Sequence, residues 1–259
     1  MAAAYRSVVI TGASSGLGAS LAALYAAPGV ALGLTGRSPE RLAAIAERCA
    51  AAGAAVRSEA LDVADASAMS DWLAGFDRDH PVDLIVANAG ISAGPRDDEP
   101  GESAAMSLGQ IGVNLLGAVH TVAPLLPAMC ARRRGRVVVI ASVAGLRGLP
   151  YSPGYCASKA GVRAYGEALR PRLSRHGVGV TVVCPGFFAS RMTDRWQGPT
   201  PFMASGEAAA RRVKRGIDRG RGRVYFPWPL VFGMRFCDIA PAPIGDWFVR
   251  RFHFHIRSA

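Results

Sequence analysis

The chain has 259 residues, of which 50% are hydrophobic and 19% are charged. This composition supports a large buried core and excludes a wholly disordered, collagen-like or coiled-coil protein. The formal net charge is +11 at pH 7, and the basic excess is greatest after residue 200, where 11 Arg and Lys accompany four Asp and Glu. Because no helix-turn-helix, zinc-finger or RNP-type motif accompanies this charge, we expect no nucleic-acid partner.

Targeting signals and cysteine usage favour a cytoplasmic protein. No uninterrupted apolar run approaches the roughly 18 residues typical of a membrane span. The N-terminus lacks the basic segment and apolar run of a signal peptide. The five cysteines form no CxxC pair, which is typical of reduced, buried thiols, and we predict no metal site.

Apolar segments of strand length alternate along the chain with segments of helical pattern. Most strand segments are rich in Val and Ile without polar alternation, as expected for strands buried on both faces of a parallel sheet. This order indicates βαβ units and predicts a single-domain, Rossmann-like α/β fold, a doubly wound parallel sheet flanked by helices. We predict strands at 7–11, 30–35, 55–61, 83–88, 136–142, 178–184 and 223–226, and helices at 16–27, 39–52, 66–79, 102–133, 154–175 and 205–219.

Residues 1–226 are interpreted as one nucleotide-binding and catalytic domain, because no linker or change in composition divides them. Within this domain, residues 187–223 form an excursion that we expect to contact the substrate. Residues 227–259 are a Pro- and aromatic-rich extension, either part of the same domain or a peripheral segment. The pattern assigns no helix or strand to this extension.

Prolines predict interruptions in three places. Pro124 and Pro127 indicate that the long fourth helix bends or ends early, since proline lacks an N–H donor and clashes with the preceding turn. Pro171 predicts a kink in the fifth helix for the same reason. Four prolines in the extension exclude one long helix there.

A glycine-rich turn follows the first predicted strand and opens the first helix. Its three glycines permit a tight turn, a close approach of the backbone to a pyrophosphate, and close packing of helix on strand. The helix would present free N–H groups and the positive end of its dipole to the phosphates. An ordinary glycine-rich turn is the alternative interpretation. The predicted dinucleotide site comprises Gly12, Ser14, Ser15, Gly16, Leu17 and Gly18.

The end of the second predicted strand distinguishes two nicotinamide cofactors. An acidic residue there would bind the ribose 2′-hydroxyl of NAD and repel the 2′-phosphate of NADP. The sequence instead has Arg37, with no carboxylate before Glu40. Because arginine forms charge-assisted bonds with phosphate, we predict a preference for NADP(H), with NAD(H) as the alternative. If Arg37 only keeps the protein soluble, it would not favour either cofactor.

Tyr155 and Lys159 are four residues apart and therefore share one face of the helix predicted at 154–175. A nearby ammonium lowers the pKa of a phenol, so this pair predicts a tyrosine that exchanges protons with an alcohol or carbonyl near neutral pH. Ser142 ends a predicted strand, at the sheet edge where open α/β folds bind ligands. A solvated Tyr–Lys pair on the surface is the alternative interpretation.

Taken together, these motifs resemble those of the short-chain dehydrogenase/reductase family over residues 7–190. Ala87 replaces an Asn that is frequent in the family, and Ser190 lies near its usual Thr, but neither departure removes a catalytic group. The matching segments are TGASSGLG at 11–18, LDV at 61–63, NAG at 88–90, VNLLG at 113–117, IASVAG at 140–145, YCASK at 155–159 and PG at 185–186.

The resemblance implies roles for the matching residues. Ser142 and Tyr155 would contact the substrate oxygen, with Tyr155 as the acid for reduction and the base for oxidation. Lys159 would hold the ribose and lower the tyrosine pKa, and Asn114 would anchor a water in a proton relay. The remaining matches would contact the cofactor: Asp62 and Val63 at the adenine, Asn88, Ala89 and Gly90 at the nicotinamide ribose, and Pro185 and Gly186 at the nicotinamide.

We therefore expect an NADP(H)-dependent oxidoreductase that transfers hydride between nicotinamide and a carbonyl or secondary alcohol, with a lipophilic compound as one option. A non-catalytic NADP(H)-binding regulatory or interaction protein is the alternative, which the intact Ser142–Tyr155–Lys159 set argues against. We expect a homodimer or homotetramer. The aromatic and basic residues of 224–259 either pack over the substrate cleft or a subunit interface, or form a peripheral membrane contact.

Overall fold

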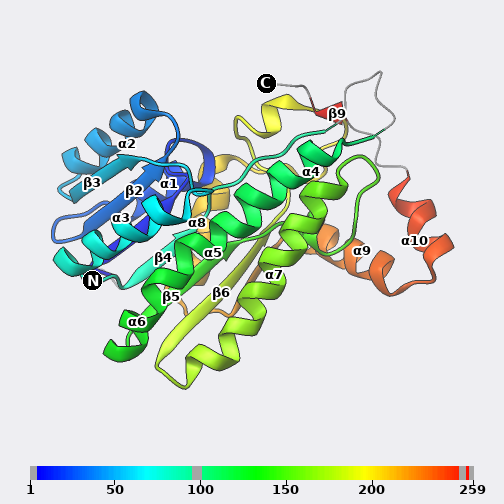
Figure 1. The fold of residues 1–259 in the computed structure, drawn as a ribbon. Helices are drawn as coiled ribbons and strands as arrows, with labels where there is room; N and C mark the ends of the chain where they lie inside the picture. Colours follow the sequence, from blue (N-terminus) through cyan, green and yellow to red (C-terminus); the bar gives the residue numbers. More distant parts are fainter. Residues whose placement is uncertain (1–4, 95–100, 251–254, 257–259) are drawn as a thin grey trace.

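One parallel sheet of seven strands organises the protein, with strand order β3-β2-β1-β4-β5-β6-β8 (Figure 1). The structure, a computed structural model, describes residues 5–94, 101–250 and 255–256. A short antiparallel pair joins β7 (Trp196–Gln197) to β9 (His255–Ile256). The strands of the main sheet are β1 (Ser7–Thr11), β2 (Ala31–Gly36), β3 (Ala55–Ala60), β4 (Leu84–Ala87), β5 (Gly135–Ile140), β6 (Val178–Pro185) and β8 (Arg223–Phe226).

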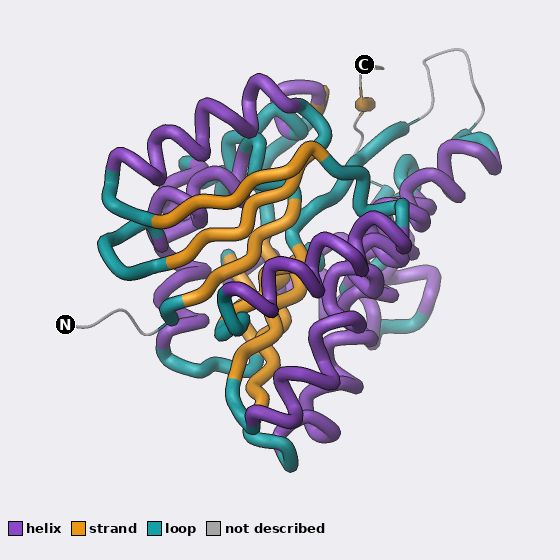
Figure 2. The backbone as a smooth tube through the Cα atoms, turned by 60° about the vertical axis from the view of Figure 1, so that its left-hand side comes forward, coloured by secondary structure: helices purple, strands orange, loops and turns teal. Residues whose placement is uncertain are grey.

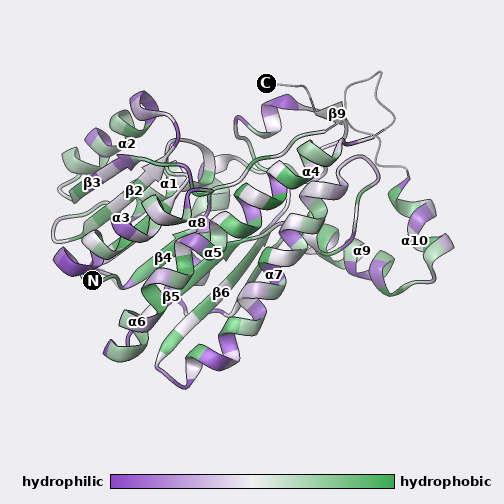
Figure 3. Cartoon of the chain, viewed as in Figure 1, coloured by the Kyte–Doolittle hydropathy of each residue, from purple (hydrophilic) through white to green (hydrophobic). Residues whose placement is uncertain are grey.

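Helices cover both faces of the sheet, so the predicted doubly wound α/β fold is confirmed (Figure 2). The central strands β4, β5 and β6 are hydrophobic, whereas the helices carry both hydrophobic and hydrophilic residues (Figure 3). One face is covered by α1 (Gly16–Tyr25), α2 (Pro39–Ala51) and α8 (Gly206–Asp218). The other is covered by α3 (Ala66–Asp79), the helical run that contains α4 to α6, and α7 (Pro153–Ser174).

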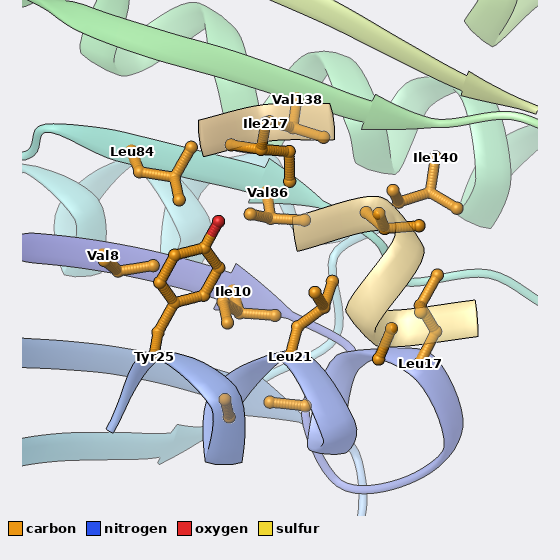
Figure 4. Close-up of a cluster of buried hydrophobic side chains, with 14 of the residues drawn as sticks. Val8, Ile10, Leu17, Leu21, Tyr25, Leu84, Val86, Val138, Ile140 and Ile217 are labelled. Atoms are coloured by element: carbon orange, nitrogen blue, oxygen red, sulfur yellow. The ribbon is translucent and has the colours of Figure 1, made fainter. Parts of the chain in front are cut away.

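The core on the α1 side shows why these segments are apolar. Leu17 and Leu21 project from α1 onto the side chains of β1 and β4, and Ile217 of α8 closes the cluster (Figure 4). Leu21 and Ile217 are fully buried. Burying a leucine or isoleucine side chain contributes about 1.5–3 kcal/mol, which fixes α1 and the glycine-rich turn that precedes it.

β3 is an exception to the prediction of strands buried on both faces. It lies at the edge of the sheet, and only Val56 and Ser58 within it are half-buried. Arg57 is exposed and pairs with Asp79 at 3.3 Å. Charged residues on an edge strand discourage pairing with other chains, which accounts for the polar character of this segment.

The long helix predicted at 102–133 is divided in the structure. Pro124 and Pro127 lie in and just after a 3₁₀ turn, where the missing N–H donors interrupt the α-helical pattern. The run is long and apolar enough to cross a membrane, but it lies against α3 and α7 as a layer of the fold. Its segments are α4 (Ala104–Ile111), a π-helical turn (Gly112–Leu116), α5 (Gly117–Val122), the 3₁₀ turn (Ala123–Leu125) and α6 (Leu126–Arg132).

The other prolines lie within helices. α7 continues through Pro171 to Ser174, and the kink at Pro171 stays a prediction. The unassigned extension forms two helices after β8, α9 (Trp228–Ile239) and α10 (Ala242–Val249). Each helix has a proline in its first turn, where the missing N–H has no intrahelical partner to lose.

Candidate active site

A cavity of about 310 Å³ lies at the carboxyl ends of the central strands. The strand order reverses between β1 and β4, and their loops leave in different directions, which opens a crevice where α/β folds bind ligands. Of the residues that the sequence predicted for cofactor or substrate, all but Gly18 and Asn114 line this cavity. The structure thus brings together motifs spread over more than 170 positions of the chain.

The glycine-rich turn fits a pyrophosphate. Gly12 has a φ of +65°, and a Cβ on it would lie 2.7 Å from the Cα of Ala89, so only glycine is accommodated there. Ser15, the N-cap of α1, makes no capping bond with its side chain. The first N–H groups of α1 therefore remain available at the cavity, where they can bind the phosphates of a dinucleotide.

Arg37 and Arg41 both line the cavity beyond this turn. Both side chains are exposed. A Cβ on Gly36, the residue before Arg37, would lie 3.0 Å from Ser14, so the end of β2 approaches the glycine-rich turn. The sequence predicted Arg37 but missed Arg41, although its spacing of four residues from Arg37 was a usable signal. Two guanidinium groups that both reach one dianionic phosphate can bind it more strongly than one.

Asp62 and Asn88, two further residues predicted to bind the cofactor, make different contacts within the protein. Asp62 is exposed, and its carboxylate accepts a bond from the N–H of Ala64 at 2.9 Å. Asn88 Nδ2 donates to the carbonyl oxygens of Thr11 and Gly12 at 2.9 and 3.2 Å. The amide of Asn88 therefore positions the glycine-rich turn from the neighbouring strand.

Ser142, Tyr155 and Lys159 converge on the cavity. Ser142 follows β5 and caps a 3₁₀ turn, where its Oγ accepts from the N–H of Ala144 at 3.1 Å. A hydroxyl can accept and donate together, and the Ser142 hydroxyl also forms a hydrogen bond with the side chain of Tyr155. Lys159 is 4% exposed, and its Nζ donates to the carbonyl of Ile140 at 2.9 Å and lies 5.9 Å from the centre of the Tyr155 ring.

The pKa of Tyr155 differs from the sequence expectation. Burial raises it to about 12, and the hydroxyl of Ser142 acts in the opposite direction without cancelling this effect. The predicted lowering by Lys159 is therefore wrong for the protein without cofactor, because the cost of burying a phenolate dominates. Burial also lowers the pKa of Lys159 to about 8. Near neutral pH, Tyr155 is protonated and can donate a proton.

Asn114 occupies the π-helical turn and does not line the cavity. Its Nδ2 donates to the carbonyl of Ile91 at 3.0 Å and to Oγ of Ser158 at 2.9 Å, and its Oδ1 accepts from the N–H of Ile91 at 2.7 Å. Both amide hydrogens are thus donated within the protein. Asn114 ties the loop after β4 to α7, and its implied role in a proton relay stays a prediction.

The cavity wall also includes many apolar side chains. Two of its side chains, Leu230 and Met234, come from α9, which the sequence could not assign. Its polar side chains include those of Ser92, Ser152, Ser190, Arg191 and Thr193. The other walls include Ile91, Val143, Leu149, Phe187 and Met192.

Comparisons with known proteins point to one family. The family model of the short chain dehydrogenases matches residues 6–199. An uncharacterized oxidoreductase of Myxococcus xanthus is 38% identical over 95% of this chain and 97% of its own. The ketoacyl reductase HetN of Nostoc is 36% identical over 70% of this chain and 63% of its own.

Solved structures extend the likeness to the fold. A short-chain dehydrogenase/reductase of Burkholderia phymatum in complex with NAD has a TM-score of 0.80, with 26% identity over 89% of this chain and 92% of its own. A short-chain dehydrogenase of Sphingobium yanoikuyae in complex with NADPH has a TM-score of 0.77, with 26% identity over 91% and 97%. The chain belongs to the short-chain dehydrogenase/reductase family, and it is an oxidoreductase that acts on CH–OH or C=O groups with a nicotinamide cofactor.

Replacing Lys159 with methionine should stabilise the protein without cofactor at pH 7. Below pH 8 the folded protein holds a buried charge, because burial lowers the Lys159 pKa to about 8 from the ordinary 10.5. Between these values the unfolded chain binds more protons at this site, so the penalty falls as the pH rises. The gain should be at most about 3 kcal/mol at pH 7 and near zero by pH 10.5.

Guanidinium unfolding of the wild type and Lys159→Met between pH 7 and pH 10.5 measures this gain. Lys214→Met is the matched control, since Lys214 is the other lysine of the chain and pairs with Asp218 in a half-buried bridge. A stabilisation by Lys159→Met that does not shrink with pH would contradict the burial of a charge at this site.

Proposed function

We propose that the protein is an NADP(H)-dependent oxidoreductase that interconverts a carbonyl and a secondary alcohol, with Tyr155 as the proton-transferring residue. The convergence of Ser142, Tyr155 and Lys159 on one cavity supports this proposal. The bound nicotinamide supplies or accepts the hydride. In reduction, Ser142 donates a hydrogen bond to the carbonyl oxygen, and that oxygen takes the proton from Tyr155 Oη as the carbon–oxygen π bond breaks.

Lys159 has two tasks in this proposal. Its ammonium stabilises the phenolate that Tyr155 becomes, by charge attraction. It also donates hydrogen bonds to the cofactor ribose, while its contact with Ile140 fixes the direction of the side chain. A non-catalytic NADP(H)-binding protein would not require this combination of groups.

Tyr155→Phe should abolish turnover and leave NADPH binding nearly unchanged. The substitution removes only the hydroxyl that transfers the proton, and such groups typically contribute about 10²–10⁴-fold to the rate. Turnover is followed by NADPH oxidation and binding by nicotinamide fluorescence. Lys159→Ala should reduce both quantities because it has both tasks. Near-wild-type turnover by Tyr155→Phe would show that another group donates the proton.

We propose that Arg37 and Arg41 give the enzyme its preference for NADPH. Arg37 and Arg41 both line the cavity, and the first carboxylate after the end of β2 is Glu40, three positions beyond Arg37. An arginine bonds to a phosphate through paired N–H donors, whereas it gains little from the ribose hydroxyl of NAD. The known structures of this family include complexes with either cofactor, so this preference depends on the chain's own residues.

Arg37→Ala should weaken NADPH binding by about 10–150-fold and scarcely change NADH binding. The estimate is the cost of one charge-assisted bond, about 1.5–3 kcal/mol. Arg41→Ala should act in the same direction, and Arg48→Ala, an exposed arginine of the same helix outside the cavity, should have no effect. Dissociation constants come from fluorescence titration. An equal loss for both cofactors would assign Arg37 a structural role.

We propose that α9 belongs to the catalytic domain and that its outer face contacts a membrane. The inner face carries Leu230 and Met234 into the cavity wall. Arg235 is half-buried in α9, and Arg250 is exposed directly after α10. Aromatic residues with arginines suit the interface of an anionic membrane. Seven apolar side chains of α9 and α10 are 45% to 83% exposed: Trp228, Phe232, Phe236, Ile239, Ile244, Trp247 and Phe248.

Co-sedimentation with vesicles tests this contact. The wild type should pellet with phosphatidylglycerol vesicles at low salt and less with phosphatidylcholine vesicles. A triple variant with Trp228, Phe232 and Phe236 replaced by serine should remain in the supernatant while it binds NADPH normally. The control replaces Leu108 and Leu116, which are exposed on the helical run 104–132, with serine. If the wild type does not pellet at low salt, the membrane contact is excluded.

We also propose that the chain forms a homodimer or homotetramer. Leu108 and Leu116 are exposed on the helical run 104–132, beside α7. Burial of such side chains between copies would remove apolar surface from water. Analytical ultracentrifugation measures the oligomeric state of the two serine variants described above. It shows whether the outer face of α9 or the face with Leu108 and Leu116 forms the subunit contact. A loss of assembly on replacing Leu108 and Leu116 identifies the subunit contact, and a loss with the α9 variant would assign the outer face of α9 to it.

A further inference from the structure

Residues 143–152 connect two of the proposed catalytic groups. Ser142 precedes this connecting segment, and Tyr155 follows it in the first turn of α7. Val143 and Leu149 of the segment line the cavity. A displacement of the segment would therefore move the apolar wall that a substrate meets beside both catalytic groups.

The connecting segment packs against α9 through a small core of its own. Val143 and Leu146 of the segment are buried together with Leu230 and Met234 of α9. This cluster is separate from the two larger clusters on the faces of the main sheet. The position of the connecting segment therefore depends on contacts with the C-terminal helices as well as on the sheet.

α10 packs on α9 and is bound to the connecting segment by an ion pair. Gly245 of α10 has no room for a side chain, because a Cβ there would meet the carbonyl oxygen of Cys237 in α9. At the next position, Asp246 Oδ1 accepts a hydrogen bond from Arg147 Nη2 of the segment at 2.6 Å. This ion pair joins residues that are 99 positions apart in the chain.

The guanidinium of Arg147 depends on this carboxylate. Its side chain is 25% exposed, and its Nε is buried without a hydrogen-bond partner among the described residues. Removal of the Asp246 charge would leave a partly buried cation without its counter-charge, which is unfavourable. The guanidinium would then turn toward water, and the neighbouring residues of the connecting segment would move with it.

We propose that Asp246 is a positioning residue, which acts through Arg147 to hold residues 143–152 in place as a wall of the substrate cavity. Neither member of the ion pair lines the cavity, so both act at a distance from the reacting atoms. Loss of the pair should therefore weaken substrate binding more than it slows the chemical step. NADPH binding should not change, because the glycine-rich turn and Arg37 follow other strands, β1 and β2. This inference rests on the reductase function proposed above.

Hydrogen exchange tests the positioning without a substrate. Asp246→Asn should speed the exchange of backbone N–H groups in residues 143–152, because local opening of the segment becomes easier. Exchanging the two charges, with Arg147→Asp and Asp246→Arg in one protein, should restore the slow exchange. Asp79→Asn is the matched control, since it breaks the exposed pair of Arg57 and Asp79 between β3 and α3.

Steady-state kinetics test the consequence for the cavity, with 2-decanone as the probe and NADPH oxidation as the readout. Asp246→Asn should raise KM about 2- to 5-fold and leave kcat and the NADPH dissociation constant nearly unchanged, as expected for one partly exposed ion pair. The charge exchange should restore KM. Asp246→Asn should lower Tm no more than Asp79→Asn does.

Unchanged exchange in residues 143–152, an unchanged KM, or a charge exchange that restores neither quantity would overturn the inference and leave the reductase function intact. A fall in Tm well beyond that of Asp79→Asn would assign the ion pair a purely structural role. If 2-decanone gives no NADPH oxidation that depends on Tyr155, the proposed reductase function fails for this ketone, and hydrogen exchange alone decides the role of Asp246.

Discussion

The close contact between the loops after β1 and β4 is the constraint on which the rest of the site depends. Thr11 Oγ accepts from the N–H groups of Asn88 and Ala89 at 3.2 and 3.3 Å, and the amide of Asn88 returns bonds to the β1 loop. Such a contact leaves no room for a side chain at Gly12. It holds the phosphate-binding turn and the segment behind the ribose in one rigid unit, so the cofactor would meet a preformed surface.

α7 is the second rigid unit, and polar contacts hold it along its length. Its first turn receives Glu102, Lys159 reaches Ile140 of β5, and Arg163 Nε donates to the carbonyl of Gly145 at 3.2 Å. Further on, Glu167 accepts from Arg163 at 3.0 Å. Burial of the Lys159 ammonium is unfavourable, yet these contacts fix the direction in which Tyr155 and Lys159 project. The buried ammonium therefore lowers the folding stability of the protein, while the contacts along α7 hold Tyr155 and Lys159 in position.

The sequence predicted β1, α3 and β8 to the residue, because caps, turns and apolar runs are local signals. It also identified the wall of the cavity, because motifs at the ends of parallel strands meet at one edge. The features that the sequence did not predict depend on contacts between residues that are far apart in the chain. The raised pKa of Tyr155 comes from burial, and the first turn of α7 is capped by Glu102, which lies 52 positions before Gly154. Neither effect leaves a pattern in the neighbouring residues.

α9 has a consequence for regulation, because one short helix faces two environments. Leu230 and Met234 touch the cavity, while Trp228 and Phe232 face outward. A ligand that displaces the inner side chains also moves the outer ones, since the helix backbone joins them. Whatever covers the outer face is then thermodynamically linked to substrate binding, and the linkage is reciprocal: each partner changes the affinity of the other by the same factor.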